Sequence, residues 1–222
     1  MKDPRYDRLA ETLVNHSISL KKGEHVLVEA FDIPQGMVIA LMREIRRRKG
    51  HPHVQLQNGQ VIREMLSGMT EEQVERLADY ELSRMKRMDA YIGLRGSDNI
   101  FENAEVPGKR MRLYMGVMRK VQNWRVNRTK WVVLRWPTPA MAQQALMGTE
   151  AFEEFFFRVC GMDYGRMIPG ERALKRLIDK TDRVEIKGPG TDLRFSMKGI
   201  KAIMSTGRHN IPDGEVFSSP VR

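Results

Sequence analysis

The residues best placed for chemistry lie near the end of the sequence. Pro212-Asp213-Gly214 predicts a tight turn, because Pro presets φ and Gly accepts a positive φ. Glu215 follows this turn directly, and His209 and Asn210 precede it. A carboxylate held in place by a turn suits metal binding or acid–base chemistry. One glutamate beside one histidine does not close a metal site, however, so spacing alone favours a solvated surface carboxylate.

The composition is that of a soluble globular protein. The 222 residues are 41% hydrophobic and 30% charged, enough for one large domain or for one domain and part of another. Cys160 is the single cysteine, which fits a reducing compartment. The N-terminus has no apolar signal segment, and no run approaches the length of a membrane span. We therefore expect a cytoplasmic protein with no membrane partner.

The formal net charge of +10 raises two alternatives to an enzyme. The first is a basic nucleic-acid-binding domain, because Trp124, Trp131 and Trp136 are interleaved with basic residues. Recognisable DNA or RNA motifs are absent and the tryptophans suit packing, so a nucleic-acid partner is not expected. The second is a non-catalytic interaction or lid module whose positive charge faces an acidic surface. The basic run Arg46–Lys49 has a simpler explanation, because it complements the C-terminal dipole of a helix.

Alternating strands and helices predict the fold of the first part of the chain. Compact apolar runs predict strands at 25–31, 53–57, 90–94 and 130–136. Apolar residues at helical spacing lie before and between them, in one case after Asp32, which we expect to cap the helix that ends at Gly50. This order predicts an α/β fold: a mostly parallel sheet with helices on both faces. No Gly-x-Gly-x-x-Gly or Walker loop follows these strands, so nucleotide binding has little support.

Beyond Pro137 the pattern changes twice. Helices are predicted at about 140–147, 150–160 and 171–180, and short antiparallel strands at 184–186, 192–197 and 202–204. We therefore predict an N-terminal α/β domain over residues 1–137, a helical connector over 138–182 and the beginning of a β-rich second domain over 183–222. This last segment has too few residues to bury a core of its own.

Several motifs occur in an order that covers nearly the whole chain. They are the Val26–Ala30 strand, Trp136–Gln143, Phe155–Phe157 with Cys160 and Asp163, Gly190–Leu193, and Asn210–Phe217 with its Pro-Asp-Gly-Glu core. In this order they resemble the N-terminal part of the aminopeptidase T family, thermophilic-type metallo-aminopeptidases with two metal ions. The Asn210–Phe217 motif is the most specific of the set.

The resemblance implies an activity and a site. It implies hydrolysis of N-terminal amino acids from peptides by a C-terminal catalytic domain, in a homodimer. Glu215 maps onto a ligand of the paired divalent metals, for which zinc, cobalt, manganese or magnesium would suit. Two such ions lower the pKa of a bound water and polarise the scissile carbonyl. His209 and Asn210 are candidates for orienting the ligand or, equally, for stabilising the turn, whereas we expect Asp213 to serve the turn and Asp192 to be structural.

The family's other ligands and its catalytic Glu and Tyr are expected beyond Arg222. We therefore expect 183–222 to be a truncated beginning of the catalytic domain, with no catalytic residue within this chain. The 222 residues alone are then expected to bind no metal and to be inactive, and their own C-terminal catalytic domain is an expected partner.

Overall fold

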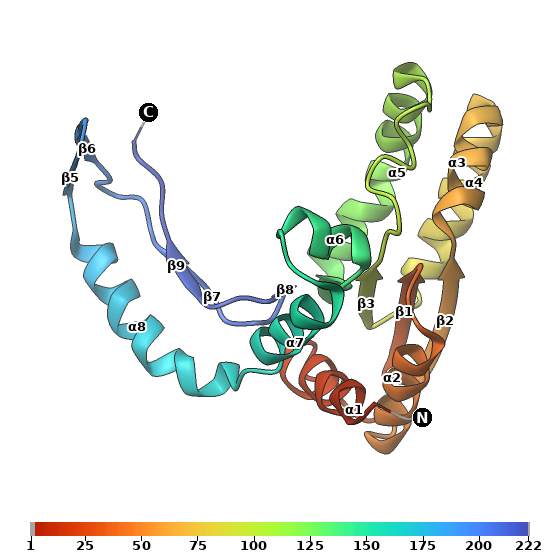
Figure 1. Cartoon of the computed structure of the whole chain (residues 1–222), viewed down its shortest axis with the longest axis horizontal. Helices are drawn as coiled ribbons and strands as arrows, with labels where there is room; N and C mark the ends of the chain where they lie inside the picture. Colours follow the sequence, from red (N-terminus) through yellow and green to blue (C-terminus); the bar gives the residue numbers. More distant parts are fainter. Residues whose placement is uncertain (1–2, 222) are drawn as a thin grey trace.

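A five-stranded parallel sheet forms the centre of the molecule (Figure 1). The computed structural model describes residues 3–221. The strand order is β2-β1-β3-β4-β8, and every neighbouring pair is parallel. The strands are β1 (His25–Phe31), β2 (His51–Gln57), β3 (Ala90–Arg95), β4 (Lys130–Arg135) and β8 (Asn210–Ile211). The α/β fold predicted from the sequence is confirmed.

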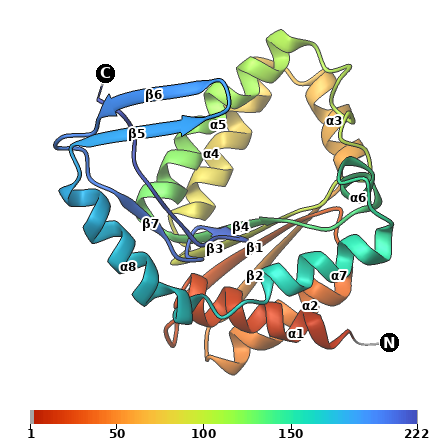
Figure 2. The ribbon, with the colours of Figure 1, turned by 60° about the vertical axis from the view of Figure 1, so that its left-hand side comes forward.

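Helices cover both faces of this sheet. In Figure 2, α1, α2 and α7 lie on one side of it and α4 and α5 on the other. The helices of this part are α1 (Pro4–Glu11) with the π-helical turn η1 (Thr12–Ser17), α2 (Gln35–Arg47), α3 (Gly59–Gly68), α4 (Glu71–Met85), α5 (Gly108–Arg128), α6 (Pro139–Gln144) and α7 (Thr149–Cys160). The helical segment before β1 is thus α-helical only in its first part.

The two faces carry separate hydrophobic clusters. Because side chains alternate along a strand, Val28, Ile92 and Leu134 face α1, α2 and α7, and all three are buried. Leu27, Tyr91 and Val133 belong to the second cluster, under α4 and α5. The first cluster contains far more buried residues, so most of the apolar stabilisation lies on that face.

Two helix starts differ in how they are capped. Thr70 and Gln73 form a capping box at the start of α4. The prediction for Asp32 was wrong, because α2 begins after Pro34 with no side-chain cap. Asp32 instead accepts hydrogen bonds from the backbone N–H of Gly59 at 2.8 Å and from Asn58 at 2.7 Å. It therefore stabilises the start of α3, across the carboxyl ends of β1 and β2.

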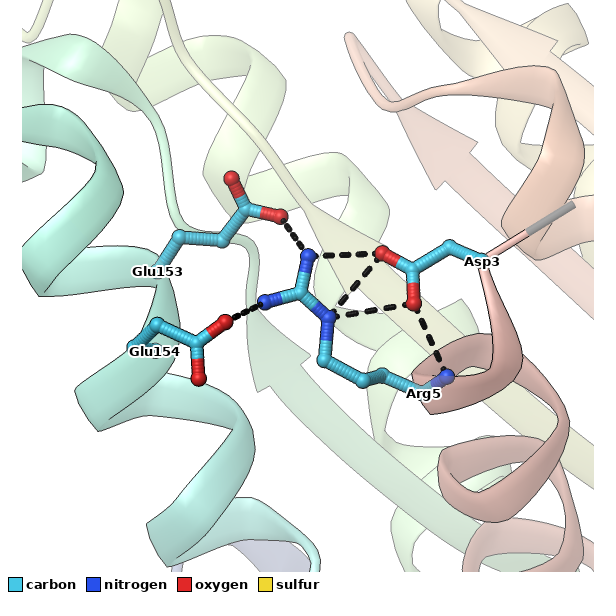
Figure 3. A network of polar contacts seen from close by, with 4 residues as sticks. All are labelled: Asp3, Arg5, Glu153 and Glu154. Atoms are coloured by element: carbon cyan, nitrogen blue, oxygen red, sulfur yellow. Dashed lines mark hydrogen bonds and ion pairs between the residues drawn. The ribbon is translucent and has the colours of Figure 1, made fainter. Parts of the chain in front are cut away.

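One polar network joins α1 to α7 (Figure 3). The guanidinium of Arg5 binds Asp3 and Glu153, each at 2.7 Å, and also contacts Glu154. It lies over the ring of Phe157 as well, 4.6 Å from the ring centroid. The two helices are about 150 residues apart in the sequence, so this network closes a long loop of the chain.

The last part of the chain is built differently. The long helix α8 (Tyr164–Lys180) leads to an antiparallel hairpin of β5 (Arg183–Gly188) and β6 (Thr191–Ser196), and β7 (Ile203–Ser205) pairs with β9 (Glu215–Phe217). In Figure 1 these elements stand apart from the helices α3 and α4. Between β7 and β9 the chain returns to the central sheet as β8, beside β4.

No helix in residues 3–221 is both long enough and apolar enough to cross a membrane.

Candidate functional site

Glu215 begins β9 and lies opposite Ser205 of β7. The turn before it is fixed by two hydrogen bonds: the N–H of Gly207 donates to Asp213 Oδ2 at 2.7 Å, and the N–H of Gly214 donates to the carbonyl oxygen of Ser205 at 3.1 Å. Asp213 therefore serves the turn. The side chain of Glu215 is exposed, so the structure presents this carboxylate to solvent from a well-held backbone.

The conformation of this turn requires Gly214, which lies against the flexible side chain of Met167 in α8. Its φ is +116°, and a Cβ built on it would lie 2.3 Å from the terminal methyl group of Met167 in α8. The turn is thus pressed against α8, which limits how far Glu215 can move.

His209 and Asn210 are placed beside the central sheet. The N–H of Val133 donates to the carbonyl oxygen of His209 at 2.9 Å, and the His209 ring lies 4.6 Å from the Trp131 ring, centroid to centroid. Asn210 pairs with Val133 in the β4–β8 ladder and is exposed. These contacts assign both residues to the junction of the turn with the sheet.

Glu171, on α8, is a second carboxylate near the turn, and no sequence motif singles it out. It is only 7% exposed, and neither of its carboxylate oxygens has a hydrogen-bond partner among residues 3–221. A Cβ on Gly214 would come within 3.9 Å of its Oε1. Burial, with a further contribution from the charge of Asp213, raises the pKa of the Glu171 carboxyl. Helical periodicity predicts that such a position is buried but does not predict its partner.

The described residues do not by themselves form a complete metal site. Within 3–221, no three His, Cys, Asp or Glu side chains are arranged to hold one ion. Glu215 is an oxygen donor of the type that divalent metals accept. The ring of His209, the nearest histidine in sequence, packs against Trp131. The donor set present here is therefore partial.

Histidines also gather at the other end of the sheet. His51 and His53 share a face of β2, and His25 of β1 joins them, with its Nδ1 2.8 Å from Nε2 of His53. Burial and the two neighbouring histidines lower the pKa of His53. The parallel register of β1 and β2, which the sequence does not reveal, brings the third ring in.

Comparison with known families identifies the chain. The sequence profile of the thermophilic metalloprotease family M29 matches residues 2–222. The chain belongs to this family. The motif order of the sequence, from the Val26–Ala30 strand to Asn210–Phe217, had indicated the same relationship.

Solved structures of this M29 member's fold include wild-type AmpT from Thermus thermophilus. The match has a TM-score of 0.77 and 19% sequence identity, and covers 98% of this chain and 62% of AmpT. The 2,5-dihydroxypyridine dioxygenase from Pseudomonas putida KT2440 matches with a TM-score of 0.51 and 12% identity, over 97% of this chain and 55% of that one. The chain thus spans less than two thirds of the length of either protein. No curated protein sequence matches it significantly.

Proposed function

We propose that this chain is the N-terminal part of a metal-dependent aminopeptidase, which removes N-terminal amino acids from peptides. The family match over residues 2–222 carries the proposal. The shared fold with AmpT over nearly the whole chain is consistent with it. In this proposal Glu215 is one ligand of a divalent-metal site, with zinc, cobalt, manganese or magnesium as the ion.

The geometry of the Glu215 turn supports this assignment. Its backbone is fixed by Asp213, Gly214 and β7, whereas its carboxylate is exposed. A ligand benefits from a fixed backbone, because less conformational freedom is lost when the ion binds. His209 and Asn210 lie where the turn joins β4, and we propose that they position it.

The other donors of the site and the catalytic residues are proposed to come from a catalytic domain outside this chain. The proposed division into an α/β domain, a helical connector and the start of a β-rich domain accommodates this. Several apolar side chains of α8 and of the segment after it are exposed and would suit such a contact or a homodimer: Leu177, Leu193, Ile203 and Phe217. A cytoplasmic location is also proposed, supported by the unpaired, buried thiol of Cys160.

The test is an assay of the complete gene product with leucine p-nitroanilide, after metal removal and after each of the four metals is returned. Activity should return with metal, and Glu215→Gln should lower both activity and bound metal by at least about tenfold. The matched control is Asp192→Asn on the exposed β5–β6 hairpin, which should change neither. Full activity of Glu215→Gln would remove Glu215 from the site.

The 222-residue chain should not release p-nitroaniline at stoichiometric metal. Measurable turnover by this chain would show that its own residues suffice for catalysis. Separately produced N- and C-terminal parts should associate on mixing, and no association would contradict the proposed contact between them.

A further inference from the structure

A cavity of about 700 Å³ lies between the sheet and the helices α3, α4 and α5. Strands β1, β2 and β3 form its floor, through residues that include Glu29, Gln55 and Tyr91. In the order β2-β1-β3-β4, the chain leaves β1 in one direction to form β2 and returns on the other side of β1 to form β3. Open parallel sheets bind ligands at such a reversal, beside the carboxyl ends of the strands. Phe31 and Arg95 end β1 and β3 and both line the cavity.

The floor contains a polar network of Glu29, Tyr91 and Arg95, in which one buried guanidinium nitrogen of Arg95 has no hydrogen-bond partner among residues 3–221. Tyr91 lies flat over Gly93, where a Cβ would come within 2.8 Å of the Tyr91 ring. The Tyr91 hydroxyl donates to Glu29 and accepts from Arg95, and Arg95 also pairs with Glu29 at 2.7 Å. Burial, and the charge of Glu29, raise the pKa of Tyr91 far above its usual value, so it remains a neutral phenol. These contacts join β1 and β3 across the floor of the cavity.

The charges around the cavity do not balance. Of the two carboxylates in its lining, Glu29 pairs with Arg95 and Glu81 pairs with Arg84. Arg119 and Arg125 also line the cavity, and neither forms an ion pair with any residue in 3–221. The guanidinium of Arg125 lies over the Tyr91 ring, 4.6 Å from the ring centroid. The buried Nε of Arg125 has no hydrogen-bond partner among residues 3–221. Two unpaired guanidinium groups favour an anion in this cavity.

The walls favour an apolar body on that anion. Ile62 and Met65 of α3, Leu77 of α4, and Met115 and Met118 of α5 line the cavity. Methionine adapts its shape and packs well against aromatic rings. The volume is within the range of small-molecule sites, most of which combine apolar walls with a few polar groups.

We propose that this cavity binds a small organic anion, a carboxylate or a phosphate monoester with an apolar body. Arg125 and Arg119 bind the anionic group, and the methionine-lined walls of α3 and α5 enclose the apolar body. The site is separate from the Glu215 turn and does not depend on the peptidase assignment.

Isothermal titration calorimetry of the 222-residue chain tests the proposal with four probes. Phenylbutyrate and phenyl phosphate present the two anionic groups, phenylbutyramide removes the charge, and inorganic phosphate removes the apolar body. At least one of the two aromatic anions should bind at least tenfold more tightly than both phenylbutyramide and inorganic phosphate. Binding of phenylbutyrate alone identifies a carboxylate site, and binding of phenyl phosphate alone a phosphate site. Equal binding of the amide, equal binding of inorganic phosphate, or no binding of either aromatic anion overturns the proposal.

Variants then locate the site. Arg125→Gln should weaken binding of the tighter aromatic anion at least tenfold. Arg128→Gln, one turn further along α5 and outside the cavity lining, should leave it unchanged. Because Arg125 also packs on Tyr91, Arg119→Gln and the cavity-filling Met118→Trp provide independent tests, and each should weaken binding at least threefold. Unchanged binding in these three cavity variants, or an equal loss in Arg128→Gln, overturns the assignment to this cavity.

Discussion

The central sheet and the two-stranded ribbons β5–β6 and β7–β9 differ in how far their residues are buried. In β3 the first five residues are buried, whereas most residues of β5 and β6 are exposed. The sheet is covered by helices on both faces, but β5–β6 and β7–β9 are two-stranded ribbons, which are marginal in water unless they pack on something else. The sheet region is therefore stabilised by burial, whereas the β5–β6 and β7–β9 ribbons rely on a few anchoring contacts.

Two buried glutamates show the same contrast. Glu44, in α2, receives hydrogen bonds from Arg47 at 2.6 Å and from Asn15 at 2.9 Å. Burial alone would raise the pKa of Glu44, but these donors outweigh it and hold that pKa below its usual value. Glu171 is equally buried, has no donor among residues 3–221, and has a raised pKa. Among residues 3–221, α8 therefore carries a buried carboxylate without a hydrogen-bond partner, and the sheet region does not.

The largest difference should appear on truncating apolar side chains. Ile92→Ala in β3 removes a fully buried side chain and should lower the free energy of unfolding by about 3 kcal/mol. Leu193→Ala in β6, half exposed, should lower it by less than about 0.5 kcal/mol. Urea denaturation of both variants measures this. A similar loss in the two would mean that the β5–β6 hairpin contributes to a core after all.

Glycine substitutions should separate the regions next. Gly93→Ala forces Tyr91 from its place over β3 and should destabilise the chain by about 2 kcal/mol. Gly170→Ala in α8 meets nothing within 4 Å and should stabilise it by about 0.5 kcal/mol, because alanine is the better helix former. Thermal unfolding followed by circular dichroism compares them. Destabilisation by Gly170→Ala would show that the surroundings of Gly170 in α8 are packed more tightly than the structure indicates.

The two glutamates should respond to pH with opposite signs. Since the folded pKa of Glu44 is lowered, its contribution is present above the usual glutamate pKa of about 4.5 and is lost as the pH falls. Since that of Glu171 is raised, its ionisation destabilises the fold as the pH rises above about 4.5. At pH 7, Glu44→Gln should lower stability by about 1 kcal/mol and Glu171→Gln should raise it by about 1 kcal/mol.

Stability measured from pH 3 to pH 8 checks these signs. Both differences from the unsubstituted chain should shrink as the pH falls, because protonation removes the charge of each glutamate. A loss of stability in Glu171→Gln at pH 7 would show that this carboxylate has a favourable partner in solution.

The smallest effects are expected for surface ion pairs. Arg5→Met breaks the network between α1 and α7 and should lower stability by about 1 kcal/mol, because one guanidinium there contacts three carboxylates. Arg194→Met on the exposed hairpin, where Arg194 pairs with Glu185, should change it by less than about 0.3 kcal/mol. The difference in stability loss between the two variants should be smaller at high salt than at low salt. Equal effects would contradict the contrast between the regions.

The sequence predicts the sheet region better than the last region for a physical reason. The strands β1, β3 and β4 are largely apolar runs that stand out in the sequence, and Thr70 with Gln73 has a recognisable capping pattern. The strand β8 has two residues and is defined by its pairing with β4, so local pattern cannot reveal it. Likewise β9 is defined by its pairing with β7. The long α8 contains Pro169, and a proline inside a helix makes the start of that helix hard to recognise in the sequence.

Site residues follow the same division. The turn motif Pro212-Asp213-Gly214 draws attention to Glu215 in the sequence. In the structure Asp213 stabilises this turn, as predicted, by accepting a hydrogen bond from Gly207. The placement of Glu171 beside the turn, and the contacts of Tyr91 and Arg95 with Glu29, join residues from different elements. Such contacts depend on strand order and helix placement, which no short motif encodes. The domain division and the metal role of Glu215 stay predictions.

The pairing of β8 with β4 also orders events during synthesis. Strands β1 to β4 are complete once residue 135 has left the ribosome, but the last strand of the sheet can dock only about 75 residues later. The edge of β4 is therefore open in the nascent chain and available to other strands until Asn210 and Ile211 arrive. Because Glu215 follows immediately, its carboxylate reaches its position only after the sheet has been completed.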